Sequence, residues 1–146
     1  MRTYDVAPQR RFLLVFDKGD DVLATLRAFA ASHAIRGAFF VALGALRSAT
    51  IAYWNPATKE YEQIAVDEQV EVLSFVGNVG VDGAETKIHA HVTLGRRDGS
   101  TIGGHLLSAT VFPTLEMHLV DYGATVVRGK DEETGLSLID DLSPRV

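Results

Sequence analysis

Cysteine is missing from the 146 residues of this chain, which excludes a disulfide framework and thiolate metal ligands. Long apolar runs are missing too. No stretch approaches the roughly 18 residues that span a membrane, so we expect no membrane partner. The N-terminus, MRTYDVAPQRRFLLVF, lacks the order of a signal peptide, which makes the cytoplasm the expected location. Positive charge is also scarce: 14 basic residues stand against 19 acidic ones, so a nucleic-acid partner would need a local basic patch.

What remains has the composition of a globular protein, 47% hydrophobic and 23% charged, and its length suits one domain over residues 1–146. We expect a core at about 10–123 and an acidic, partly apolar C-terminal tail at 124–146. Strong helical spacing occurs in one segment, from about Asp21 to His33. Asp20 or Asp21 can cap this helix, because a short carboxylate accepts from free first-turn amides.

Most of the chain has the pattern of β-strands. Short apolar or alternating runs are bounded by turn residues such as Asn55-Pro56. The fold class that follows is α/β (α+β), a mostly antiparallel sheet of seven or eight strands packed with one main helix. The expected strands are 11–17, 38–46, 48–54, 60–66, 70–80, 86–94, 101–112 and 115–123.

Three of the five histidines lie between Lys87 and Leu107. Side chains alternate between the faces of a strand, so His89 and His91 share one face, roughly 6.5 to 7 Å apart. Two such rings can converge on one ion that takes nitrogen ligands at about 2.0 to 2.1 Å. Whether His105 joins them depends on the intervening turn.

Two turns are compatible with the sequence. A two-residue loop at Asp98-Gly99 places His105 on the core face. A three-residue loop at Arg97-Asp98-Gly99, with Gly99 left-handed, sets His105 opposite His91. We favour the second loop. A bulge at Gly103-Gly104 would shift this register. Those glycines either clear room for a ligand beside His105 or mark a close approach of another strand.

Other candidate groups have weaker support. Three neutral imidazoles would leave an ion's charge uncompensated and a position open, as in catalytic zinc sites. Glu68, Glu71 and Glu85 are candidate general bases, but no pattern fixes them near the histidines. His33 is expected to serve the helix end, and His118 is expected to be a half-buried sheet residue.

The segment with His89-Ala90-His91, Asp98-Gly99 and Gly103-Gly104-His105-Leu106 resembles the PPC domain, the domain conserved between plants and prokaryotes. VEVLSFVGNV is similar to that family's E-x-L-S-x-x-G strand, and RGKDEETGLSLID is similar to its D-x-x-T-G-L tail. The similarity covers nearly the whole chain and indicates a prokaryotic single-domain type without the AT-hook of plant members.

The resemblance implies a homotrimer and a divalent metal, with zinc expected, held by His89, His91 and His105. Gly99, Gly103 and Gly104 would support that site. It implies no organic cofactor and leaves open whether the chain is an enzyme. Three hypotheses follow: a trimeric metal-binding domain with a regulatory or interaction role, a DNA-binding protein as the family label suggests, and a zinc enzyme acting on a small substrate. Net charge and the missing AT-hook weigh against DNA.

Overall fold

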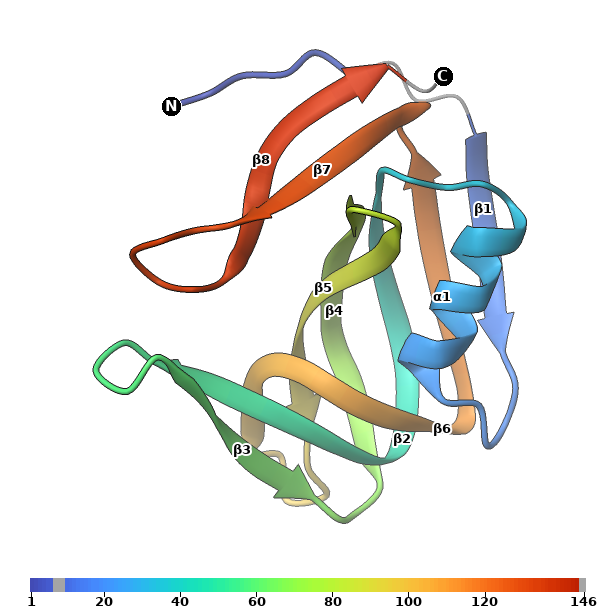
Figure 1. The fold of residues 1–146 in the computed structure, drawn as a ribbon. Coiled ribbons are helices and arrows are strands. Elements are labelled where there is room, and N and C mark those ends of the chain that lie inside the picture. Colours follow the sequence, from blue (N-terminus) through green and yellow to red (C-terminus); the bar gives the residue numbers. More distant parts are fainter. Residues whose placement is uncertain (7–9, 145–146) are drawn as a thin grey trace.

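The computed structural model describes residues 1–6 and 10–144, and within them one helix and eight strands form an α+β fold (Figure 1). The helix α1 spans Val22–Ser32 and lies against the sheet. The strands are β1 (Arg10–Phe16), β2 (Ala38–Asn55), β3 (Glu60–Val66), β4 (Val70–Asp82), β5 (Glu85–Gly95), β6 (Thr101–Asp121), β7 (Ala124–Lys130) and β8 (Ser137–Pro144). In the described part of the chain, no helix is long and apolar enough to cross a membrane.

The predicted number of strands is right, but their division along the chain was wrong. The runs 38–46 and 48–54 form the single strand β2, and the runs 101–112 and 115–123 fall largely in β6. Register shifts, rather than chain breaks, separate the halves of β2 and β6. Gly44 lies at one shift with φ +143°, where a Cβ atom would clash with the Thr114 carbonyl oxygen. Pro113, which has no N–H to donate, falls within the irregular stretch of β6.

The strand pairings close on themselves. β2 pairs with β4, β4 with β5, β5 with β6, and β6 returns to β2, all antiparallel. β3 extends this sheet beside β2, and β1 extends it beside β6. A parallel contact, Val81 with Val127, joins β4 to β7. The predicted antiparallel character is therefore confirmed for most of the sheet.

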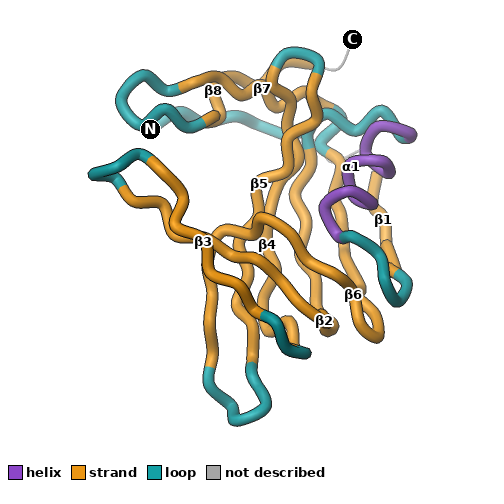
Figure 2. Tube along the Cα trace, turned by 60° about the horizontal axis from the view of Figure 1, so that its bottom comes forward, coloured by secondary structure: helices purple, strands orange, loops and turns teal. Residues whose placement is uncertain are grey.

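The helix covers one face of the sheet and completes the core (Figure 2). Asp21 caps it, because its carboxylate accepts from the Ala24 amide at 2.8 Å. Leu26 and Ala30 are fully buried with sheet residues such as Phe40 and Met117. Residues that alternate with Phe40 point the other way. Within the described residues no helix covers that opposite face of the sheet.

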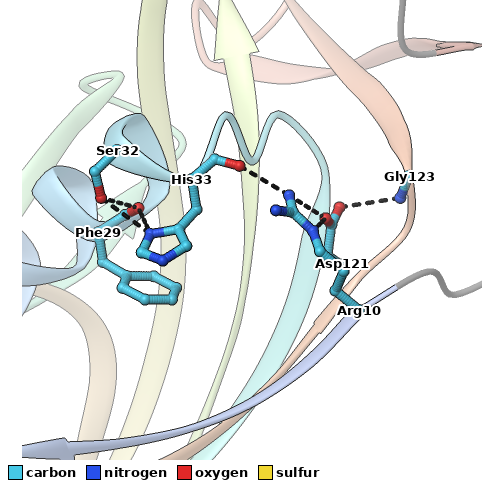
Figure 3. Close-up of polar contacts among 6 residues, drawn as sticks. All are labelled: Arg10, Phe29, Ser32, His33, Asp121 and Gly123. Carbon is cyan, nitrogen blue, oxygen red and sulfur yellow. Dashed lines mark hydrogen bonds and ion pairs between the residues drawn. The ribbon is translucent and has the colours of Figure 1, made fainter.

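The end of the helix is tied to the sheet through an ion pair whose carboxylate is buried (Figure 3). Arg10 donates to the Asp121 carboxylate from Nε at 2.8 Å and lies within 2.7 Å of it through Nη2. The same Nη2 donates to the His33 carbonyl oxygen at 2.8 Å. The His33 ring stacks on Phe29 at 4.1 Å, so this histidine belongs to the helix end, as expected.

Apolar side chains remain exposed on the face away from the helix, which we call the open face. Leu13, Val15 and Leu43 are 60%, 62% and 59% exposed. The register aligns the set across four strands, with Leu13 beside His118, His118 beside Val41 and Val41 beside Val76. The open face consists of Leu13, Val15, Phe39, Val41, Leu43 and Val76.

The C-terminal segment expected as a tail is a hairpin, β7–β8, packed back on the sheet. Arg128 Nη2 donates to Asn78 Oδ1 at 2.6 Å, and Ser137 Oγ donates to the Asp82 carboxylate at 3.0 Å. In Figure 1 this hairpin and the β2–β3 hairpin extend on the same side of the sheet.

Candidate metal site

The turn between β5 and β6 is the three-residue loop that the sequence favoured. Arg96 N donates to the Ser100 carbonyl oxygen at 2.8 Å, and Gly99 adopts φ +82°. Asp98 Oδ1 accepts from both the Ser100 amide and the Ser100 hydroxyl. The pairing continues without a shift to His91 opposite His105, which confirms the predicted register.

His89, His91 and His105 meet on the face away from the core. One ring nitrogen from each lies within 4.8 Å of the other two, and the ring centroids are 5.2 to 5.4 Å apart. Nitrogens bound to one ion at about 2.1 Å would lie roughly 3.4 Å apart in a tetrahedral arrangement. Side-chain rotations that move each ring by about an ångström close this difference, so the cluster could hold a metal ion.

The surroundings of His89 and His105 favour neutral imidazole, the form that binds metals. Burial, followed by the nearby His89, His91 and Arg128, lowers the pKa of His105 to about 4. Burial and Arg128 also lower the pKa of His89. His105 Nδ1 is buried and, among the described residues, has no hydrogen-bond partner. A buried ring nitrogen of this kind fits a missing ligand better than a finished core.

The glycines beside His105 permit close approach of the neighbouring strands. A Cβ atom at Gly103 would lie 2.7 Å from the Val92 carbonyl oxygen, and one at Gly104 would lie 2.8 Å from the Ala52 carbonyl oxygen. Of the two interpretations of these glycines, strand approach therefore accounts for both, because their Cβ positions face backbone rather than open space.

A cavity of about 480 Å³ opens beside His89 and His105. Tyr61 of β3 stacks on the His105 ring with centroids 4.8 Å apart. Lys87 and Arg128 bring positive charge to the wall. The remaining wall residues are Ile88, Leu136, Ser137, Leu138 and Ile139.

Sequence reasoning missed most of this cavity. The alternation in EYEQIAV could have marked Tyr61 as facing one side of β3, but no local pattern gives the register that sets it against His105. Arg128 lies 50 residues from its acceptor Asn78, and only the folded hairpin brings the two together.

The other sequence candidates lie elsewhere. Glu68 pairs with Arg96 at 3.0 Å, and Glu71 lies opposite Gly95 at the far end of β5. Glu85 pairs with Lys87 at 2.8 Å, and none of the three glutamates lines the cavity. His118 is exposed rather than half-buried, and it lies outside the cluster of three.

Comparison with known proteins gives consistent similarities. Residues 5–122 match the family model of the Plants and Prokaryotes Conserved (PCC) domain. A metal-containing protein from Archaeoglobus fulgidus is 36% identical, with 97% of this chain and 100% of that chain covered and a TM-score of 0.90. A plant- and prokaryote-conserved (PPC) protein from Pyrococcus horikoshii is 30% identical over 98% and 99% of the two chains, with a TM-score of 0.90. A Bacteroides thetaiotaomicron protein provisionally described as DNA-binding is 27% identical over 92% and 96%, with a TM-score of 0.86. No curated protein matches the chain.

Proposed function

Because this chain belongs to the Plants and Prokaryotes Conserved domain family, the PPC family that its sequence resembles, we propose that it is a homotrimeric metal-binding protein. His89, His91 and His105 hold one divalent ion per subunit, and zinc is the expected ion. The convergence of three ring nitrogens within 4.8 Å carries this proposal. A relative described as metal-containing supports it.

The donor set suits zinc among the common ions. Imidazole nitrogen is a preferred zinc ligand, whereas magnesium and calcium take oxygen ligands. Three neutral imidazoles and one divalent ion would carry a net positive charge and leave a position for an exogenous group. We assign a binding role rather than catalysis, because none of the candidate glutamates lines the cavity at the histidines.

Elemental analysis of protein purified without an affinity tag tests the metal site. We expect about one zinc per chain, falling below about a tenth in His91→Ala, because three-ligand sites depend on each ligand. His91 is exposed, so this change leaves the core intact. His118→Ala removes another exposed sheet histidine and is the matched control, with metal content unchanged. A wild-type content that stays near zero after zinc is added overturns the proposal.

The open face supports the homotrimer. Exposed apolar patches of this kind mark association surfaces, and the helix already covers the other side of the sheet. Sedimentation equilibrium should give a species about three times the 15.8 kDa chain. Leu43→Glu should release monomers, whereas Tyr53→Glu, a 60% exposed position outside the open face on the same strand, should not. A wild-type monomer at micromolar concentration contradicts this assignment.

An ion pair at the β5–β6 turn argues against DNA binding, the alternative function. Of the arginine pair at the β5–β6 turn, Arg96 is held by Glu68 at 3.0 Å, so its charge is partly neutralised. A useful site needs on the order of 6 to 10 phosphate contacts. We expect no sequence-specific binding at physiological salt in a gel shift. Submicromolar binding at about 150 mM salt that survives Arg96→Ala/Arg97→Ala would establish a DNA site away from this turn.

A further inference from the structure

Arg128 is a buried cation whose hydrogen bonds go to neutral acceptors. It is 7% exposed. Nη1 donates to the Ser137 carbonyl oxygen at 2.7 Å, and Nη2 donates to Asn78 Oδ1 at 2.6 Å. Nε is buried with no hydrogen-bond partner among the described residues. Buried charges are normally paired, so a guanidinium placed in this way points to an anion that the described residues do not supply within ion-pair distance.

One carboxylate, Asp82, lies close enough to affect Arg128, but among the described residues no ion pair joins the two. Asp82 acts on Arg128 through space, but its Oδ2 accepts from Ser137 Oγ at 3.0 Å. Burial lowers the pKa of Arg128, yet a guanidinium stays charged at neutral pH.

Strand β4 leaves room for the Arg128 side chain. Asn78 and Gly80 lie on the same face of β4, opposite His89 and Lys87 of β5. A Cβ atom at position 80 would lie 3.3 Å from Arg128 Nε, so glycine leaves the side chain its path across the strand. This path ends beside His89, and the positive charge contributes to the lowered pKa of that ring.

Arg128, His89 and His105 line the same cavity of about 480 Å³. Among the described residues in its wall there is no carboxylate. Lys87, the second cation of the wall, is paired with Glu85, whereas no carboxylate of the described residues lies within ion-pair distance of Arg128. The rest of the wall is mainly apolar, with Leu138 and Ile139 contributed by β8.

We propose that this cavity binds a small organic carboxylate with a short apolar tail. Its carboxylate lies at Arg128, beside the positive charge of the ion held by the histidines, and its tail lies against Leu138 and Ile139. A volume of this size falls in the range of small-molecule sites, about 300–1,000 Å³. The contribution of the ion rests on the proposed metal function, whereas the contribution of Arg128 does not.

Calorimetric titration of the tag-free full chain tests the proposal, with hexanoate as the probe and zinc content measured on the same samples. We expect hexanoate to bind at least about tenfold more tightly than acetate, because the tail buries apolar surface. Inorganic phosphate and hexylamine complete the set. Hexanoate that binds no better than acetate, or more weakly than phosphate, overturns the proposal, as does hexylamine binding equally well.

Variants assign the binding to the arginine. Arg128→Gln should weaken hexanoate at least about tenfold, and Arg128→Lys, which keeps the charge, should recover part of the loss. Because Arg128 is buried, a second pair of variants guards against misfolding. Ile139→Glu adds a competing carboxylate to the wall and should abolish binding. Ile64→Glu, at an equally exposed position on β3, should not.

The zinc content of the same samples distinguishes failure of the carboxylate site from failure of the proposed metal function. Zinc present with no hexanoate binding overturns the carboxylate site alone. Zinc absent overturns the proposed metal function, and hexanoate binding that depends on Arg128 in such samples still supports the site. Full hexanoate affinity in both Arg128→Gln and Ile139→Glu contradicts the assignment of the cavity.

Discussion

Acid should destabilise the metal-free protein through His105 before it protonates the carboxylates. The pKa of this ring is about 4 in the folded chain, against a reference of 6.5. Below pH 6.5 the unfolded chain therefore takes up the proton first, and stability falls until the folded ring also titrates near pH 4. The stabilisation is fully present above pH 6.5 and is lost as the pH falls towards 4. His89, whose pKa is also lowered, acts in the same direction.

The size of the effect follows from the separation of the two pKa values. The difference between 6.5 and about 4 is about 2.5 pH units, and at about 1.36 kcal/mol per unit the ceiling is near 3.4 kcal/mol. His105 is partly exposed, so solvent screening reduces this ceiling, and we expect about 2 kcal/mol between pH 7 and 4.5.

Urea unfolding in the presence of a chelator measures this loss, at one protein concentration because association also affects stability. His105→Gln cannot titrate, so its stability should fall less over the same pH range than that of the wild type. Asp98 and Asp131 have lowered pKa values through hydrogen bonds from Ser100 and Thr134, so their contribution disappears only at lower pH. Equal pH slopes for wild type and His105→Gln would refute the reasoning.

Two further predictions concern stability. Gly104→Ala should reduce both stability and zinc content, because the new methyl group would lie 2.8 Å from the Ala52 carbonyl oxygen, whereas Gly99→Ala should cost only about 1 kcal/mol for its left-handed φ and keep the metal. Equal zinc content in the two variants would contradict this account. Arg10→Ala should lower the free energy of unfolding by about 2 kcal/mol, because it removes the charge-assisted hydrogen bond that Arg10 Nε donates to the fully buried Asp121 carboxylate, which keeps the bond from the Gly123 amide. A loss below about 0.5 kcal/mol in chemical denaturation, as for an exposed pair, would contradict that estimate.

The sequence predicted the candidate metal site more completely than it predicted the strand boundaries. Alternation alone placed His89 and His91 on one face. A left-handed Gly99 suited the loop that sets His105 opposite His91, and the favoured loop was also the one that brings the three histidines together. Both inferences depend on local geometry, which a sequence carries directly.

The strand boundaries depend on distant contacts. Gly44 and Pro113 look like breaks in a sequence, yet Gly44 lies at a register shift within β2 and Pro113 lies at one within β6, and the two strands pair with each other on both sides of the shift. The apolar residues of the C-terminal segment, Leu136, Leu138, Ile139 and Leu142, could pack on the body or on a neighbouring subunit. No local pattern gives the β7–β8 pairing, which is fixed to the sheet through contacts such as Arg128 with Asn78. Propensity is a weak guide where tertiary pairing decides the outcome.

The open face and the histidine cluster belong to one row of paired residues. From β1 to β6 the row runs Leu13, His118, Val41, Val76, His91 and His105. Each strand alone shows only alternation, and the side chains directed away from the core differ in type from strand to strand. The apolar part ends at Val76, and His91 lies one strand spacing, about 4.8 Å, beyond it. A second subunit that covers the open face would therefore reach the edge of the histidine cluster. The open face and the candidate metal site are thus both formed by residues that pair across strands, not by residues that are neighbours in the sequence.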